Sequence, residues 1–420
     1  MNPRAASSLL SAWLREALAP ACSPDLSGKL LQARGAAKAR SVGAPWPAIF
    51  QRAHAQGIAP LLHASLDRWG LLEVLAREAT PFGNARGATL RQNILYLAEL
   101  GRITEALSAA GVRAVLLKGA AFLGDLYDHP GDRPMSDLDL LVTPLEVAAA
   151  LRILESLGYA PLRPGLGAAL LRTNHEIEFA RRLPDGTVLY VELHWRLIPA
   201  ESLVAGPARE PAVFRERSRP CAGAGVRADV LSPEDALVFS AIHLQRHAYS
   251  RAIWFVDLAL LIRRHPIDWR AVVHAARAWE AGPAAFVALS GARSLCGAAV
   301  PATVMKSLHP GRGRAAVFDA ILPWHRMFGA QSAMGEHALP PTRRYLLKLL
   351  QARDTLAALR RIAGMIFPSE QWLRARYGFR SPGLPPGIRR RHLLRAGRAA
   401  LGRGAGAGSL QHLKPAAGAE

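Results

Sequence analysis

The first hundred residues carry hydrophobic side chains at helical spacing. One such stripe is formed by Ile58, Leu61, Leu62 and Leu66. A second stripe follows at Leu90, Ile94, Leu97, Leu100 and Ile103. Side chains at intervals of three and four residues share one helical face, so we predict an N-terminal helical region over residues 1–107.

After Gly111 the pattern changes to short hydrophobic runs that are typical of strands. Residues 112–117 form a compact hydrophobic run that ends at Lys118 and Gly119. This pattern predicts a buried strand that ends in a turn. A short helix is expected over residues 120–127.

A loop and a second strand are predicted next. Residues 129–134 contain two prolines and a glycine, which prevent regular pairing and predict a loop. Residues 136–142 are hydrophobic apart from Ser136 and two aspartates, and they predict another strand. A helix is expected over residues 144–157.

Two alternating runs predict a β-hairpin. Hydrophobic and polar residues alternate over 176–180 and over 188–195, and Pro184, Asp185 and Gly186 lie between the runs. These three residues are a turn signal. The stretch 200–229 is rich in Pro, Gly and Arg, and it leaves room for short strands.

Helical patterns return at Ser232, which is a good N-cap because proline and two acidic residues follow it. They continue to about residue 376. The remaining chain is basic and rich in Gly, Pro and Ala, so we expect a disordered tail over residues 378–420.

Together these elements predict an α+β protein, in which a small mixed β-sheet core is flanked by N-terminal and C-terminal helical regions. The expected units are the N-terminal helical region at 1–107, the α/β core at 108–229, the C-terminal helical domain at 230–377 and the tail at 378–420.

The composition is that of a folded protein, and it bears on whether the protein binds nucleic acid. The 420 residues are 50% hydrophobic and 20% charged, which is enough to bury a core. The formal net charge of +21 suggests nucleic-acid binding. However, only six of the 53 basic residues are lysines. An arginine excess beside abundant Ala, Gly and Pro is typical of a GC-rich coding sequence, so a nucleic-acid partner is the less favoured interpretation.

The cysteines and the hydrophobic runs predict a cytoplasmic protein. Cys22, Cys221 and Cys296 are far apart and form no CxxC pair, which argues against a disulfide framework or a zinc ribbon. Arg15 and Glu16 interrupt the only leader-like run. No uncharged run approaches the roughly 18 residues of a membrane span, so no membrane partner is expected.

Two carboxylates in one predicted strand are the first candidate site. Asp137 and Asp139 are two residues apart, so in a strand both side chains point to the same side. Ionised carboxylates this close repel each other and are costly to bury. A bound Mg²⁺ or Mn²⁺ would resolve the conflict. The competing interpretation is a strand end whose acids reach solvent or pair with arginines.

Candidate phosphate contacts surround this pair in the sequence. Lys118 and Gly119 close a strand just before a helix, which places backbone N–H groups and a cation where phosphate oxygens can bind. Ser136 is a candidate donor to phosphate or to a metal-bound water. Arg133 lies on the loop that enters the same strand.

The predicted hairpin offers a third acidic ligand. Glu192 and His194 alternate with Leu193 and therefore share one face of their strand. We predict Glu192 as the third metal ligand, with Glu178 on the preceding strand as the alternative. His194 either orients Glu192 or contacts a phosphate, or it has a structural role beside Trp195.

His243 and His247 are four residues apart and share one helical face. This spacing occurs in zinc sites. The sequence shows no glutamate directly after His243 and no evident third ligand, so the structural interpretation is favoured.

These residues resemble a known family. The strand ending in Lys118-Gly119, the run from Arg133 to Val142, and the run from Val191 to Trp195 are similar to the uncharacterised nucleotidyltransferase family, within the DNA polymerase β-like superfamily. Segments after residue 230 are similar too, and the resemblance spans about residues 45–378.

The resemblance implies a nucleotidyltransferase core that uses two divalent metal ions. It implies transfer of a nucleoside monophosphate from a nucleoside triphosphate to a small-molecule, peptide or protein acceptor by in-line displacement. Asp137 and Asp139 match the paired metal ligands, Glu192 matches the third acid, and Gly119 matches the glycine of the phosphate-side turn. The superfamily turn commonly carries Gly-Ser or Gly-Gly, whereas this chain has Gly119-Ala120.

The predicted mechanism adds further contacts to the bound groups. Lys118 and Arg133 would supply cations to the departing pyrophosphate, and Ser136 and His194 would complete the nucleotide site. Mg²⁺ or Mn²⁺ is the implied cofactor, with the triphosphate as co-substrate. An alternative function is a binding protein with this fold and weak catalysis, which uses its basic surface to hold RNA or a protein.

Overall fold

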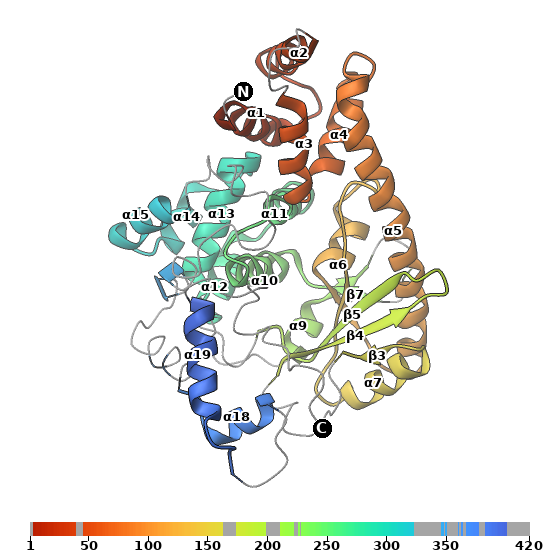
Figure 1. The fold of residues 1–420 in the computed structure, drawn as a ribbon, viewed down its shortest axis with the longest axis vertical. Coiled ribbons are helices and arrows are strands. Elements are labelled where there is room, and N and C mark those ends of the chain that lie inside the picture. Colours follow the sequence, from red (N-terminus) through yellow and green to blue (C-terminus); the bar gives the residue numbers. More distant parts are fainter. Residues whose placement is uncertain are drawn as a thin grey trace.

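The structure is a computed structural model of the 420-residue chain. It describes residues 3–38, 45–162, 174–198, 211–221, 226, 228–322, 346–347, 349–350, 360, 363, 367–377 and 383–400. A seven-stranded mixed sheet is flanked by helices from both ends of the chain (Figure 1). The predicted α+β class is confirmed.

The sheet combines parallel and antiparallel pairs in the order β3-β4-β5-β2-β1-β7-β6. Its strands are β1 (Val115–Leu117), β2 (Leu138–Leu141), β3 (Ala160–Pro161), β4 (Glu176–Arg182), β5 (Val188–His194), β6 (Arg219–Pro220) and β7 (Asp229–Val230). Strand β2 lies at the centre, antiparallel to β1 and parallel to β5. The predicted hairpin is the β4–β5 pair. Of the two short strands near the stretch 200–229, β6 lies within it and β7 begins at its last residue.

Five of the helices in the described part of the chain precede the sheet. They are α1 (Pro3–Glu16), α2 (Pro24–Lys38), α3 (Pro45–Ala55), α4 (Ala59–Arg68) and α5 (Ala76–Ala109). Aromatic rings join them, since the ring centroids of Trp13 and Phe82 are 5.5 Å apart. The first predicted stripe is confirmed, because its four members are buried. Helix α5 is long and runs along one flank of the sheet (Figure 1).

The second predicted stripe is confirmed at Leu100 and Ile103, which are buried, and is wrong at Ile94. Ile94 is 53% exposed, whereas Asn93 and Tyr96 are buried on the inner face of α5. Asn93 Nδ2 donates to the carbonyls of Pro130 (2.6 Å) and Arg133 (2.8 Å), and the Tyr96 hydroxyl donates to the carbonyl of Ser136. The inner face of α5 therefore uses polar groups to hold the loop before β2.

Among the residues that the structure describes, three helices belong to the region around the sheet. They are α6 (Lys118–Asp125), α7 (Val147–Ser156) and α9 (Pro211–Arg217). Helix α6 contacts both β1 and β2, and it begins at Lys118, earlier than predicted. Strand β2 begins at Leu138, so Asp137 lies just before the strand and not within it.

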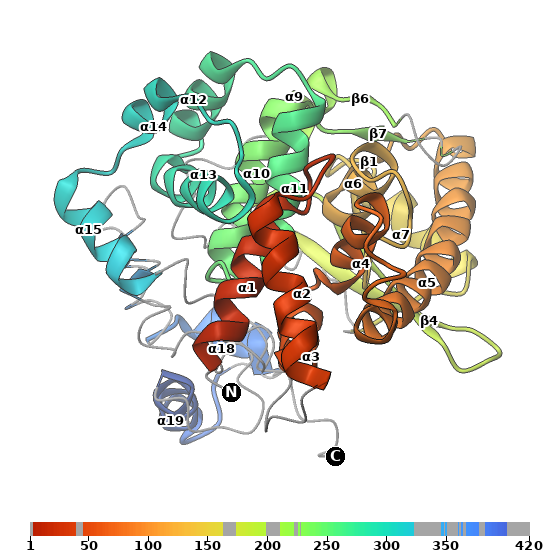
Figure 2. The same ribbon diagram turned by 90° about the horizontal axis from the view of Figure 1, so that it is seen from above.

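The C-terminal half is helical, as predicted. Its helices are α10 (Pro233–Arg246), α11 (Ala252–Arg264), α12 (Trp269–Ala278), α13 (Gly282–Cys296), α14 (Ala302–Leu308), α15 (Arg312–Ile321), α18 (Glu370–Tyr377) and α19 (Ile388–Ala400). The predicted N-cap is confirmed, because Ser232 Oγ accepts from the Asp235 amide at 3.2 Å. Helix α13 packs against α1, α10 and α11. Figure 2 shows this group of helices on one side and the sheet with α5 on the other.

Part of the predicted disordered tail is helical. Residues 388–400 form α19, and the Tyr377 hydroxyl lies 3.0 Å from His392 Nδ1, which joins α18 to α19. Leu373 and Ile388 are buried, so hydrophobic contacts override the basic composition here. Residues 401–420 lie outside the described part of the chain.

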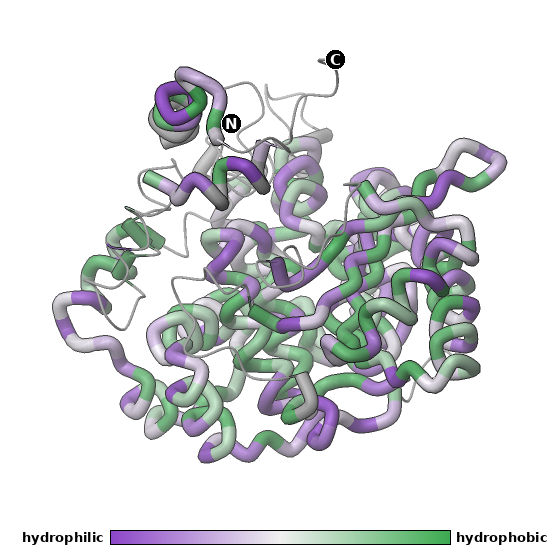
Figure 3. The backbone as a smooth tube through the Cα atoms, turned by 90° about the horizontal axis from the view of Figure 1, so that it is seen from below, coloured by the Kyte–Doolittle hydropathy of each residue, from purple (hydrophilic) through white to green (hydrophobic). Residues whose placement is uncertain are grey.

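Hydrophobic segments gather in the middle of the molecule, and hydrophilic residues occupy many outer turns (Figure 3). The three cysteines are free. None of the helices that the structure describes is long and apolar enough to cross a membrane.

Candidate active site

The parallel pairing of β2 and β5 brings two predicted acids together. Asp139 lies directly opposite Glu192 in the register of these strands, and paired residues point to the same face of a sheet. Asp139 is only 1% exposed, and Glu192 is half-buried. Oxygens of both carboxylates and a nitrogen of His194 all lie within 4.8 Å of one another.

Lys118 lies between these two carboxylates. Its Nζ forms an ion pair with Asp139 Oδ1 and lies 3.4 Å from Glu192 Oε2. Burial alone would lower the pKa of Lys118, but the charges of Asp139 and Glu192 outweigh it and raise that pKa. The residue has a φ of +47°, a left-handed conformation that costs about 1–2 kcal/mol outside glycine.

His194 is the second positive partner of the acids. Its Nε2 lies 3.0 Å from Asp139 Oδ1 and 3.5 Å from Glu192 Oε2. Burial lowers the pKa of His194, but hydrogen bonds to Asp139 and Glu192 outweigh burial and raise it to about 9. Two carboxylates therefore face two cationic groups, which makes their close approach tolerable without a metal ion.

Asp137 lies beside this cluster and not in it. It directly precedes β2 and is partly exposed, and Ser136 Oγ donates to its Oδ1 at 3.3 Å. Burial, followed by the negative charges of Asp139 and Glu192, raises the pKa of Asp137 to about 7. The three predicted acids are thus electrostatically connected, although only two of them are in close contact.

Arg133 forms a buried ion pair with another residue of the protein. Its guanidinium is buried and donates to both carboxylate oxygens of Asp257 in α11 at 2.8 Å. The predicted contact of Arg133 with a phosphate is therefore not part of the observed geometry. A Cβ atom on Gly119 would lie 2.9 Å from Arg133 Nη1, which explains why the turn needs glycine at this position.

Sequence reasoning missed Glu176. The β4–β5 register places Glu176 opposite His194 and the alternative ligand Glu178 opposite Glu192. Glu176 Oε2 lies 3.2 Å from His194 Nδ1, so Glu176 contacts the other side of the same imidazole. The sequence contained this information, because a hairpin turn centred on Asp185 fixes which residues of β4 and β5 face each other.

His243 and His247 pack against each other and against Trp254. Their ring centroids are 4.6 Å apart, and both rings contact Trp254, at 4.9 and 5.1 Å. Burial keeps the pKa of His243 well below its ordinary value.

The donor chemistry of the site fits a hard divalent cation. Asp139, Glu192 and the nearby Asp137 offer carboxylate oxygens, which are the preferred protein ligands of Mg²⁺ and Mn²⁺. In this structure, Lys118 and His194 balance the negative charge of the carboxylates.

The sequence matches the model of a known protein family. The family model described as uncharacterised nucleotidyltransferase matches residues 43–297, which is more than half of the chain. The match includes the sheet and helices α3 to α13, but not α1 or α2. No curated protein matches the chain.

Proposed function

The chain belongs to the uncharacterised nucleotidyltransferase family, and on that premise we propose that it transfers a nucleoside monophosphate from a nucleoside triphosphate to an acceptor. The acceptor class is a small molecule, a peptide or a protein. The acceptor oxygen forms a bond to the α-phosphorus, the bond to the leaving oxygen breaks, and pyrophosphate departs. The acceptor proton passes to a carboxylate or to water.

The observation that carries this proposal is the in-register pair Asp139 and Glu192. A buried carboxylate pair on adjacent strands is costly unless cations share its space. Asp137, Asp139 and Glu192 would hold Mg²⁺ or Mn²⁺ in a two-metal arrangement. Such ions, when bound, neutralise phosphate charge and lower the pKa of an attacking hydroxyl.

The chain's own groups have distinct roles in this proposal. Lys118 supplies a cation beside the carboxylates, and the amides at the start of α6 near Gly119 supply donors for phosphate oxygens. His194 holds Asp139 in place through Nε2. Ser136 orients Asp137. Arg133 acts as a positioning residue that supports the Gly119 turn.

The proposal is tested by labelling. Purified protein is incubated with each of the four labelled nucleoside triphosphates, with Mg²⁺, in a lysate of the native host. We expect label from one nucleotide to enter a discrete product, and we expect Asp139→Asn to abolish it. Asp128→Asn, a change at an exposed residue, is the matched control. Equal labelling by wild type and Asp139→Asn would overturn the proposal.

A second candidate is a binding protein that has the same fold and weak turnover. The observation that favours it is the position of Lys118, which already pairs with Asp139 and Glu192. Thermal unfolding distinguishes the two functions. Stabilisation by one nucleotide that requires Mg²⁺ and is lost in Asp139→Ala supports the enzyme, whereas stabilisation by RNA without metal supports the binding protein.

A further inference from the structure

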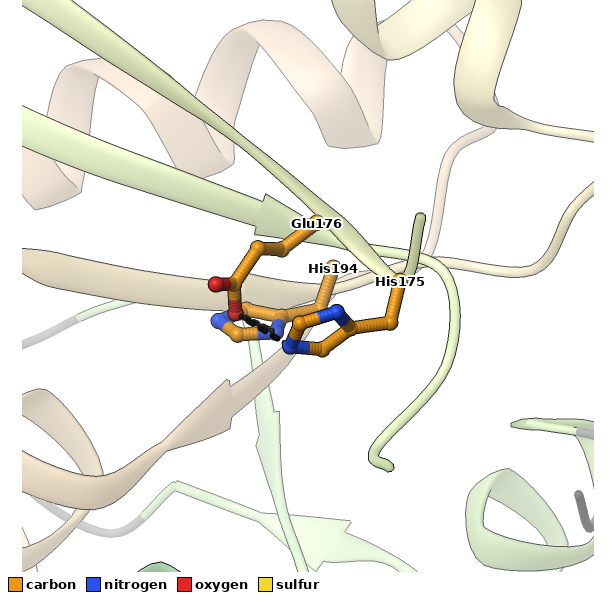
Figure 4. Close-up of side chains that lie close together, drawn as sticks. All are labelled: His175, Glu176 and His194. Carbon is orange, nitrogen blue, oxygen red and sulfur yellow. Dashed lines mark ion pairs between the residues drawn. The ribbon is translucent and has the colours of Figure 1, made fainter. Parts of the chain in front are cut away.

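A second polar cluster lies on the far side of His194. His175 directly precedes β4, Glu176 is the first residue of β4, and His194 is the last residue of β5. The Trp195 amide donates to the His175 carbonyl at 2.9 Å and holds the two strand ends together. Figure 4 shows both imidazole rings beside the Glu176 carboxylate.

Three donor atoms converge in this cluster. Glu176 Oε2 lies 2.9 Å from His175 Nε2 and 3.2 Å from His194 Nδ1. All three atoms lie within 4.8 Å of one another. Ligand atoms of a tetrahedral zinc site are roughly 3.3 Å apart, given metal–ligand distances of about 2.0–2.1 Å. The spacing of the cluster is therefore close to that of a metal site.

The contacts among these three atoms are ion pairs and not hydrogen bonds. His175 Nε2, Glu176 Oε2 and His194 Nδ1 are buried and make no hydrogen bond to any part of the chain that the structure describes. His194 is 1% exposed and His175 is 8% exposed. Buried polar atoms normally have partners, because an unsatisfied one costs about 1–3 kcal/mol. A single ion bound by all three atoms would satisfy them together.

We propose that His175, Glu176 and His194 bind a transition-metal cation of the Zn²⁺ class. Two imidazole nitrogens and one carboxylate oxygen are a typical ligand set for such ions, whereas Mg²⁺ prefers oxygen ligands alone. Three protein ligands leave one coordination position for water or another ligand. This site is separate from the carboxylates of Asp139 and Glu192, and it does not depend on nucleotidyl transfer.

His194 links the proposed site to the candidate active site. Its Nδ1 faces Glu176, while its Nε2 faces Asp139 at 3.0 Å. A histidine that binds metal through one nitrogen commonly donates the other N–H to a carboxylate, which fixes the tautomer and the ring orientation. Metal at Nδ1 would thus leave Nε2–H to donate to Asp139 and would position that acid.

The competing explanation is that protons hold the cluster together. An imidazolium beside Glu176 would satisfy the same distances, and Arg246 Nη2 lies 3.8 Å from Glu176 Oε1. In that case the cluster binds no metal ion. Direct metal binding separates the two explanations.

The test uses the full-length protein after treatment with a chelator. Zn²⁺ is titrated calorimetrically in excess Mg²⁺, and Co²⁺ binding is followed by its visible absorption. We expect one Zn²⁺ per chain and the absorption of a low-coordinate nitrogen and oxygen site. The variants His175→Ala and Glu176→Gln should each fail to bind this Zn²⁺ ion. His274→Ala and Glu155→Gln change exposed residues elsewhere, and they should retain it.

A third variant assigns the ion to this cluster. Asp139→Asn should still bind one Zn²⁺, because Asp139 is not among the three proposed ligands. Glu176→Gln preserves side-chain size and reports on the site if His175→Ala fails to fold. The proposal is overturned if the wild-type protein binds no Zn²⁺, or if both ligand variants bind as much as wild type. None of these measurements requires transferase activity, so failure of the proposed function would leave this test intact.

Discussion

Arg133 and Asp257 form a buried, two-point ion pair across 124 residues of sequence. Arg133 Nε and Nη2 each donate to one carboxylate oxygen at 2.8 Å, and the Tyr127 hydroxyl donates to the same carboxylate at 2.7 Å. The pair joins the loop before β2 to α11. It therefore ties the loop that carries Asp137 to the C-terminal helices.

Loss of one partner should destabilise the protein strongly. We expect Asp257→Asn to lower the free energy of unfolding by about 3 kcal/mol, because Arg133 is left buried without its counter-charge. Asp128→Asn breaks the exposed pair with Arg264 and should cost less than about 1 kcal/mol. Urea unfolding measures both. Similar losses in the two variants would contradict the importance of burial here.

The turn at Gly119 should not tolerate a methyl group. Gly119→Ala places a Cβ 2.9 Å from Arg133 Nη1 and 3.2 Å from Met135 Cγ, and the pair with Asp257 prevents Arg133 from moving away. We expect a loss of roughly 1–3 kcal/mol in thermal or chemical unfolding. Gly101→Ala in α5 meets nothing within 4 Å and should be neutral or slightly stabilising. If the two substitutions have equal effects, the close approach at Gly119 is not significant.

Asp137 should matter for activity more than for stability. Asp137→Asn removes a negative charge beside Asp139 and Glu192, whose repulsion contributes to raising the pKa of Asp137 to about 7. Thermal unfolding should therefore show unchanged or increased stability. Nucleotidyl transfer should fall by at least about 100-fold. Asp319→Asn, at an exposed position of α15, is the control, and full activity of Asp137→Asn would contradict the assigned role.

Glu99 should make stability depend on pH. Its carboxylate accepts from Arg102 and Arg181, both at 2.6 Å, and from the Tyr159 hydroxyl at 3.1 Å. Burial raises the pKa of Glu99, but these hydrogen bonds outweigh burial and hold it below its ordinary 4.5. The resulting stability is present above pH 4.5 and is lost as the pH falls through the lower folded-state pKa.

Unfolding of Glu99→Gln tests this dependence. The variant should lose about 1–2 kcal/mol at neutral pH, a value reduced by the partial exposure of both arginines. The difference in unfolding free energy between this variant and the wild type should shrink as the solution is acidified. Glu105→Gln, at an exposed position of the same helix, should follow the wild type. A constant difference at all pH values would exclude the proposed linkage.

Local patterns predicted the strands and the caps but not the contacts between them. Alternation and the turn at Asp185 identified the β4–β5 hairpin, and Ser232 identified the start of α10. On α5, the burial of Leu100 and Ile103 was predicted, but that of Asn93 and Tyr96 was missed because these two residues are polar. Their burial is favourable only because carbonyls of the loop before β2 accept from them, and that loop is distant in sequence.

In the candidate site, too, local patterns predicted the strands but not the contacts between them. The sequence placed Asp139 and Glu192 on strands, but their adjacency depends on the parallel pairing of β2 with β5, which no local pattern encodes. Arg133 and Lys118 were expected to contact phosphate, whereas their observed partners Asp257 and Asp139 come from other elements. Ion pairs between distant segments follow from tertiary structure, so single-sequence reasoning cannot assign them.

The β4–β5 turn has a consequence for sequence variation among relatives of this protein. Glu176 faces His194 only because the turn contains a fixed number of residues. A change of one residue in turn length would shift the register and rotate the β4 side chains to the opposite face. Homologues that share this cluster are therefore expected to differ freely in the amino acids at the tip of the hairpin, but to carry neither insertions nor deletions there.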